Sequence, residues 1–109
     1  MDKRLSLKYI LVLITSPEKK AKAIVEHLLR KKLIACGNIV KNVQSLYWWE
    51  GKICCDDEVL IILKTKKKFF KKIIKEVKTI HPYKVPEIIS LNLYSGNKDY
   101  LNWIDEVTK

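Results

Sequence analysis

The chain has 109 residues, of which 48% are hydrophobic and 31% charged; this indicates one globular domain and excludes a disordered chain. Lysine and arginine outnumber acidic residues by 22 to 12, so the formal net charge of +10 favours solubility and attracts polyanions without indicating any fold. The cysteines, Cys36, Cys54 and Cys55, are odd in number and lack CxxC spacing, which argues against a disulfide framework, a zinc finger and a thioredoxin-like site.

The first segment predicts a short tail followed by a buried strand. Residues 1–8 are mostly polar and are expected to be a flexible extension of a single domain covering 1–109. Residues 9–14 form a continuous apolar run, which is typical of a strand covered on both faces. The run is too short for a signal sequence or a membrane span, so we expect a soluble, cytoplasmic protein with no membrane contact.

A helix is expected next, beginning near Pro17. Thr15 and Glu18 have the spacing of a capping box, and proline suits the first turn. The apolar stripe at helical spacing consists of Ala21, Ile24, Val25, Leu28 and Leu29. The basic residues at 30–32 suit the negative end of the helix dipole.

Residues 33–64 are expected to form two long strands. The sequence 37–38 indicates a bulge or bend, and residues 45–49 are rich in strand formers. Residues 50–52 read as a tight turn in which Gly51 supplies a positive φ. The returning strand covers about 53–64, so the pair should form an antiparallel ribbon with Cys54 and Cys55 on opposite faces.

The last part of the chain predicts helix, strand and helix. Thr65 is the candidate cap of a helix over about 66–79, and the prolines within 81–87 prevent helical structure there. A strand over 88–94 and a C-terminal helix containing Tyr100 and Ile104 follow. The order predicts an α+β, ferredoxin-like split βαβ sandwich: a four-stranded antiparallel sheet with helices on one face plus a C-terminal helix.

One face of this sheet would remain uncovered. Tyr47, Trp48 and neighbouring aliphatic residues are expected there, and oligomerisation is the simplest way to bury them. Aromatic residues also stack on nucleic-acid bases, and the net charge keeps nucleic acid as a competing partner. Because basic composition alone is common, nucleic acid is not the expected partner.

Motifs in several places resemble the CutA divalent-cation tolerance family. The resemblance covers about residues 9–108 in order, and its motifs lie at 15–17, 33–39, 45–52, 64–65, 81–88, 96 and 100–104. It implies a ferredoxin-like subunit in a tight homotrimer, with sheets packed around the threefold axis. It also implies a role in tolerance of divalent cations, with copper the suggested ion, Cu(I) or Cu(II). One departure is Gly37, where the family more often has a larger residue such as valine.

Three residues are candidate metal ligands. Cys36 offers a thiolate to a soft metal such as Cu(I), or is simply a small buried side chain. His81 is a natural copper or zinc ligand, or a ring whose nitrogens bind the backbone at the helix end. Glu87 is the third, although an ion pair with a lysine across a subunit interface is favoured for it.

The remaining candidates favour structural roles. An exposed loop or sheet edge is the preferred interpretation for the acidic run 56–58, because successive strand side chains cannot converge on one ion. His27 is expected to face solvent. No nucleophile with an obvious histidine base, carboxylate pair or glycine-rich phosphate loop is present, so the protein is not expected to be an enzyme. The main hypothesis is a copper-binding trimer in metal-ion response; the alternative is a structural or signalling trimer that binds a small ligand or a partner protein at its subunit clefts.

Overall fold

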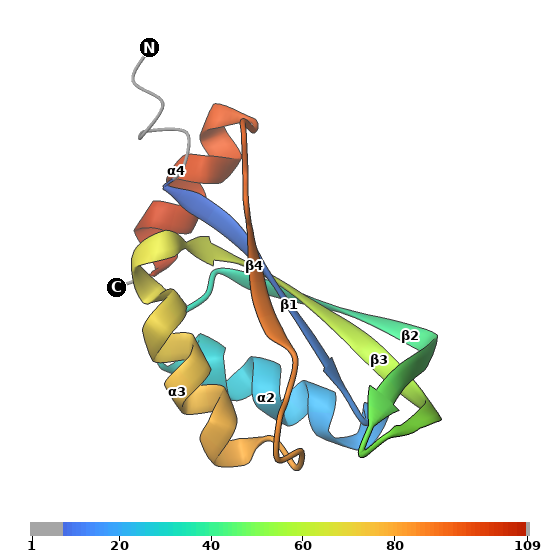
Figure 1. Ribbon diagram of the computed structural model, residues 1–109. Coiled ribbons are helices and arrows are strands. Elements are labelled where there is room, and N and C mark those ends of the chain that lie inside the picture. The colour runs from blue at the N-terminus through green and yellow to red at the C-terminus, as the bar shows by residue number, and fades with distance from the viewer. Residues whose placement is uncertain (1–7, 109) are drawn as a thin grey trace.

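The computed structural model describes residues 8–108 and has the expected order of elements (Figure 1). These are β1 (Tyr9–Ser16), α2 (Glu18–Arg30), β2 (Cys36–Trp49), β3 (Lys52–Lys66), the 3₁₀ turn η1 (Lys67–Phe69), α3 (Phe70–Ile80), β4 (Ile88–Asn92) and α4 (Lys98–Val107). The strands form one antiparallel sheet in the order β2-β3-β1-β4, which confirms the ferredoxin-like α+β fold. The sequence predicts a flexible extension over residues 1–8. Of these, residues 1–7 lie outside the described residues, and only Lys8 is described.

The core lies between one face of the sheet and the helices. Along β1, Ile10, Val12 and Ile14 are buried, whereas Leu11 and Leu13 between them are only half-buried. The strand expected to be covered on both faces is therefore covered fully on one. The side chains on the second face of β1 are also apolar, although the chain does not fully bury them.

Helices α2 and α3 lie side by side over the buried face (Figure 1). Four of the five residues of the predicted stripe are buried, namely Ala21, Ile24, Val25 and Leu28, whereas Leu29 is 40% exposed. His27 does not face solvent as expected, because its Nε2 lies 2.8 Å from Glu76 Oε1 on α3. This hydrogen bond links the outer edges of the two helices.

The hairpin of β2 and β3 reaches beyond the helices (Figure 1). Its turn is formed by Glu50 (φ 50°) and Gly51 (φ 77°), so the predicted tight turn is confirmed with both central residues left-handed. The bulge lies between Val40 and Val43, where Asn42 has φ 63°, and not at 37–38. The register pairs Cys54 with Tyr47 and Cys55 with Leu46, which confirms that the two cysteines lie on opposite faces.

Both predicted helix caps are wrong, because strand pairing extends into the cap positions. Thr15 belongs to β1, and Pro17 is the N-cap of α2 without a side-chain capping bond. β3 continues through Lys66, opposite Tyr9, so helix α3 starts only at Phe70 after η1. The Thr65 hydroxyl donates to the Leu33 carbonyl instead of capping a helix.

Candidate functional site

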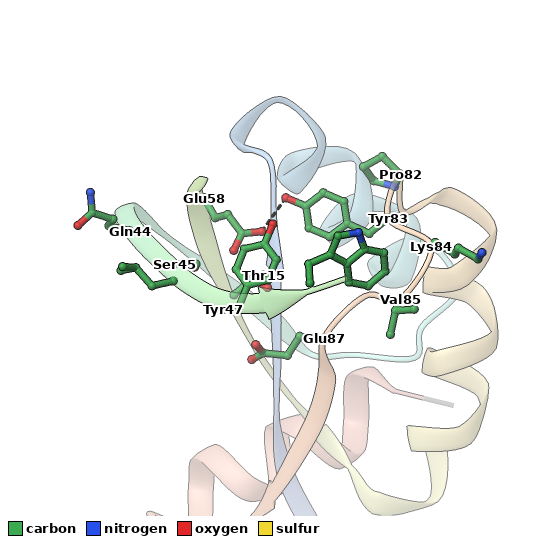
Figure 2. Close-up of a pocket in the computed structure, with 12 residues that line it drawn as sticks. Thr15, Gln44, Ser45, Tyr47, Glu58, Pro82, Tyr83, Lys84, Val85 and Glu87 are labelled. Carbon is green, nitrogen blue, oxygen red and sulfur yellow. Dashed lines mark hydrogen bonds between the residues drawn. The ribbon is translucent and has the colours of Figure 1, made fainter. Parts of the chain in front are cut away.

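A pocket of about 750 Å³ opens between the β2–β3 hairpin and segment 82–87 (Figure 2). Aromatic side chains from both sides line it, together with two carboxylates, Glu58 and Glu87. Lys84 is also at the rim but points away from the other side chains in Figure 2. The charged groups that face the cavity are therefore acidic, and the pocket suits a cationic or hydrogen-bond-donating group rather than an anion.

The His81 ring fixes segment 82–87 against β1. Its Nε2 donates to the Thr15 carbonyl at 2.8 Å, and its Nδ1 accepts from the Tyr83 backbone N–H at 3.1 Å. Both ring nitrogens are used, which defines the neutral tautomer with hydrogen on Nε2. The prolines at 82 and 86 restrict the rest of the segment, so Tyr83 is held over the sheet.

Two tyrosine–carboxylate pairs lie at the pocket, and Tyr47, Glu58 and Tyr83 among them line it. The Tyr83 hydroxyl donates to Glu58 Oε2 at 2.6 Å, and Glu58 is only 7% exposed. The Tyr47 hydroxyl donates to Asp56. Asp56 and Glu58 are two residues apart on β3 and lie on one face of the strand. The acidic run thus lies in a paired strand and not in a loop; Asp56 and Asp57 are exposed, as expected, whereas Glu58 is buried.

Both phenols remain protonated at neutral pH. Burial, and then the bond to Glu58, raises the pKa of Tyr83 well above its ordinary value of 10. The hydrogen bond to Asp56 raises the pKa of Tyr47 to about 12. The two side chains act as hydrogen-bond donors that hold the carboxylates in place.

We expect Tyr83→Phe to lower the free energy of unfolding by about 1–3 kcal/mol, because it leaves the nearly buried Glu58 carboxylate without its donor. Urea unfolding at one fixed subunit concentration measures the change. Tyr94→Phe is the matched control, because that ring is 87% exposed. Equal stability of the Tyr83→Phe variant and the control would show that the bond contributes nothing.

The same pair makes a pH prediction. The pKa of Tyr83 is raised on folding, so its stabilising contribution is complete below pH 10 and is lost as the pH rises through the folded-state value. The stability difference between the wild type and Tyr83→Phe should therefore be constant up to about pH 9 and shrink above pH 10. A difference that stays constant to pH 11.5 would contradict the assignment.

The structure separates the three candidate metal ligands. Glu87 lines the pocket, and His81 lies at the same end of the sheet, bound to Thr15. Cys36 pairs with Lys64 near the opposite end, where its Sγ lies 4.0 Å from Asn38 Oδ1. Within residues 8–108 no three His, Cys, Asp or Glu side chains are grouped so that they could hold a metal ion.

The pocket residues that the sequence did not single out are Glu58 as a buried carboxylate and Tyr83 as its donor. Period-two spacing could have placed Asp56 and Glu58 on one face of a strand. No local signal connects position 58 with position 83.

No helix within the described part of the chain has the length and apolar character needed to cross a membrane.

Comparisons with known proteins agree on one family. The model of the CutA1 divalent ion tolerance protein family matches residues 10–107. The divalent-cation tolerance protein CutA of Thermus thermophilus is 43% identical over 89% of this chain and 95% of its own. That of Pyrococcus horikoshii is 43% identical over 92% of this chain and 98% of its own. A structure from Archaeoglobus fulgidus, described as a periplasmic divalent cation tolerance protein CutA, superposes with a TM-score of 0.90 at 39% identity, covering 93% and 99% of the two chains.

Proposed function

Because this chain belongs to the CutA1 divalent ion tolerance family, we propose that it works as a homotrimer in the cellular response to divalent metal ions, with copper as the ion to test first. The role is binding rather than catalysis. Both histidines are occupied by other groups: His27 faces Glu76, and His81 binds two backbone groups. Neither is placed as a base for a cysteine or hydroxyl nucleophile.

The observation that carries the trimer is the uncovered apolar face of the sheet. Leu91 (52% exposed) and Ile89 (49%) lie on this face opposite the half-buried Leu11 and Leu13. Val40 continues the face on β2, where it is 44% exposed. A contiguous apolar surface of this kind favours association, because contact with another subunit removes it from water.

The hairpin adds further apolar surface at its tip. Trp48 is 73% exposed, and it pairs across the hairpin with Ile53, which is 67% exposed. Leu46 on the same face is 66% exposed. Large side chains of this kind dominate protein interfaces, and the length of the hairpin allows it to reach a neighbouring subunit.

Within residues 8–108 of one chain, the three candidate ligands do not come together as a metal centre. Cys36 lies away from the pocket, and both His81 nitrogens are engaged in hydrogen bonds. We therefore place cation binding between subunits, with Cys36 as the first ligand to test because its thiol is only half-buried and free.

Native mass spectrometry of the protein purified without chelator tests oligomer and metal together. Three subunits carrying copper would support the whole proposal. A metal-free trimer that takes up no added Cu(I) would support the proposed oligomeric state and contradict the proposed copper role. A monomer of 12.8 kDa at every concentration would contradict the trimer.

We expect Cys36→Ser to weaken Cu(I) binding at least about tenfold, since even loss of a residue that only supports a ligand commonly costs 10–100-fold in affinity. Competition with a chromogenic Cu(I) chelator measures the change. Cys55→Ser is the matched control, because it removes an exposed thiol on the hairpin. His81→Ala and Glu87→Gln test the other two candidates in the same way. Unchanged affinity in all three ligand variants would reject this ligand set.

The pocket supports the alternative function. Its carboxylates and aromatic walls suit a small ligand with a cationic group, bound by a trimer that has no metal role. Retention of such a ligand by the metal-free trimer, and its loss in Glu58→Gln, would favour this function over copper binding.

We also propose a cytoplasmic location, in keeping with three cysteines that are all unpaired. The relative from Archaeoglobus fulgidus is described as periplasmic, so the location needs its own test. Fractionation of cells that express the full chain distinguishes the two compartments.

A further inference from the structure

The positive charge of this protein is concentrated in one layer. Residues 18–32 and 67–80, which contain α2, η1 and α3, hold twelve lysines and arginines and three glutamates, a net charge of +9 out of +10. The remaining 80 residues hold ten basic and nine acidic residues. We call residues 18–32 and 67–80 the basic layer.

All twelve basic side chains of this layer are exposed. The apolar stripes of the helices point into the core, where Leu28 and Ile73 are fully buried, so the charged residues are left on the outer side. Within residues 8–108, Lys31 is the only one of the twelve that forms an ion pair, at 3.7 Å from Glu76. Most of the charge is therefore available to a partner.

The fold gains nothing evident from this arrangement. Lys67, Lys68, Lys71 and Lys72 crowd the start of α3 and its preceding turn, where no acidic residue is present. Cations are unfavourable at the positive end of a helix dipole, and neighbouring lysines repel one another. By contrast, Lys66 beside them is buried and paired with Asp105 at 3.3 Å, as expected for a structural lysine.

From the charge, exposure and lack of pairing we propose that the basic layer binds the phosphodiester backbone of duplex nucleic acid without sequence preference. Lysines neutralise phosphates as point charges, which is sufficient for such binding. The sequence alone did not favour nucleic acid, because the net charge does not show where on the surface the charged side chains lie. The structure shows that two helical segments, which are 37 positions apart from the end of α2 to the start of η1, form one surface.

Other polyanions fit this surface less well. Single strands are bound through stacked aromatic rings, but Phe69 is buried and Phe70 is half-buried. Peripheral membrane binding usually combines charge with inserted apolar side chains. Leu29 is the only large hydrophobic residue of the basic layer that is exposed.

The experiment compares two variants with the same net charge. One replaces four lysines within the basic layer by glutamine: Lys71, Lys72, Lys75 and Lys78. The other replaces four exposed lysines elsewhere: Lys41, Lys52, Lys84 and Lys98. Glutamine has a helix propensity close to that of lysine, and native mass spectrometry checks that both variants keep the wild-type subunit number. Fluorescence anisotropy with a labelled 20-base-pair DNA duplex then gives affinity between 50 and 200 mM salt.

We expect wild-type affinity to fall steeply with salt. In the basic-layer variant, the slope of log affinity against log salt should become shallower by about 3–4, because each phosphate contact contributes about 0.9. The other variant should change by less than about 1. Equal losses in both variants would overturn the proposal in favour of a net-charge effect. Failure of the wild-type protein to bind the duplex at 50 mM salt would also overturn it, and binding only to anionic vesicles would assign the surface to a membrane.

Discussion

In the proposed trimer, the double variant Ile89→Lys/Leu91→Lys is expected to abolish association and leave a monomer. Both side chains are about half exposed within one chain, at 49% and 52%, so lysine there should disturb the isolated subunit little. In a trimer packed through the uncovered apolar face of the sheet, the same positions would bury two unpaired charges in each subunit, which is strongly unfavourable. Size-exclusion chromatography with light scattering measures the mass directly.

Leu29→Lys is the matched control. It makes the same kind of change at a residue that is 40% exposed, but on α2, away from the uncovered apolar face of the sheet. The control should remain a trimer and the double variant should not. The double variant should also unfold at lower temperature, since subunit association contributes to apparent stability in a concentration-dependent way. A trimer that persists in the double variant would place the interface elsewhere.

The second large effect is expected at Gly37. This residue lies on β2 opposite Leu63, directly beneath α2. A Cβ at this position would be 2.6 Å from Val25 Cγ1 and 3.1 Å from Leu63 Cδ2. The first distance is shorter than any normal carbon contact, and the branched Val25 side chain has few alternative rotamers in a helix. Glycine thus allows the helix to approach the sheet closely here.

Gly37→Val should therefore destabilise the protein by about 3 kcal/mol or more, the upper range for overpacking of a core. Adding Val25→Ala should recover much of the loss, because it removes the methyl groups that the new side chain meets. A double-mutant cycle, measured by urea unfolding at fixed subunit concentration, gives the coupling between the two positions. Gln44→Val, an exposed change on the same strand, is the control.

An additive result would contradict the packing argument. If the two changes together cost the sum of their separate costs, contact between α2 and Gly37 would not be the reason for glycine. Strong coupling would show that the residue at position 25 determines which side chain fits at position 37.

Local sequence patterns were sufficient to predict the elements and their order. Period-two and helical spacing depend only on neighbouring residues, so the stripe of α2 and the tight turn at Gly51 could be predicted without knowledge of contacts. The order of elements predicted an uncovered face of the sheet, but β1, expected to be covered on both faces, is covered fully on only one. Where one strand competed with a helix for the same residues, local signals failed: Thr65 is a good cap by type, yet pairing with Ile10 keeps it in β3.

The candidate sites, by contrast, depend on contacts between distant parts of the chain. Glu58 and Tyr83 are 25 positions apart, and His81 and Thr15 are 66 apart, so no spacing rule could connect them. The place of Gly37 beneath Val25 and the joining of two basic helices into one surface depend in the same way on how the chain returns on itself. Local periodicity fixes which side of an element is apolar, whereas the partner of each side chain is fixed by long-range packing, which short spacings do not encode.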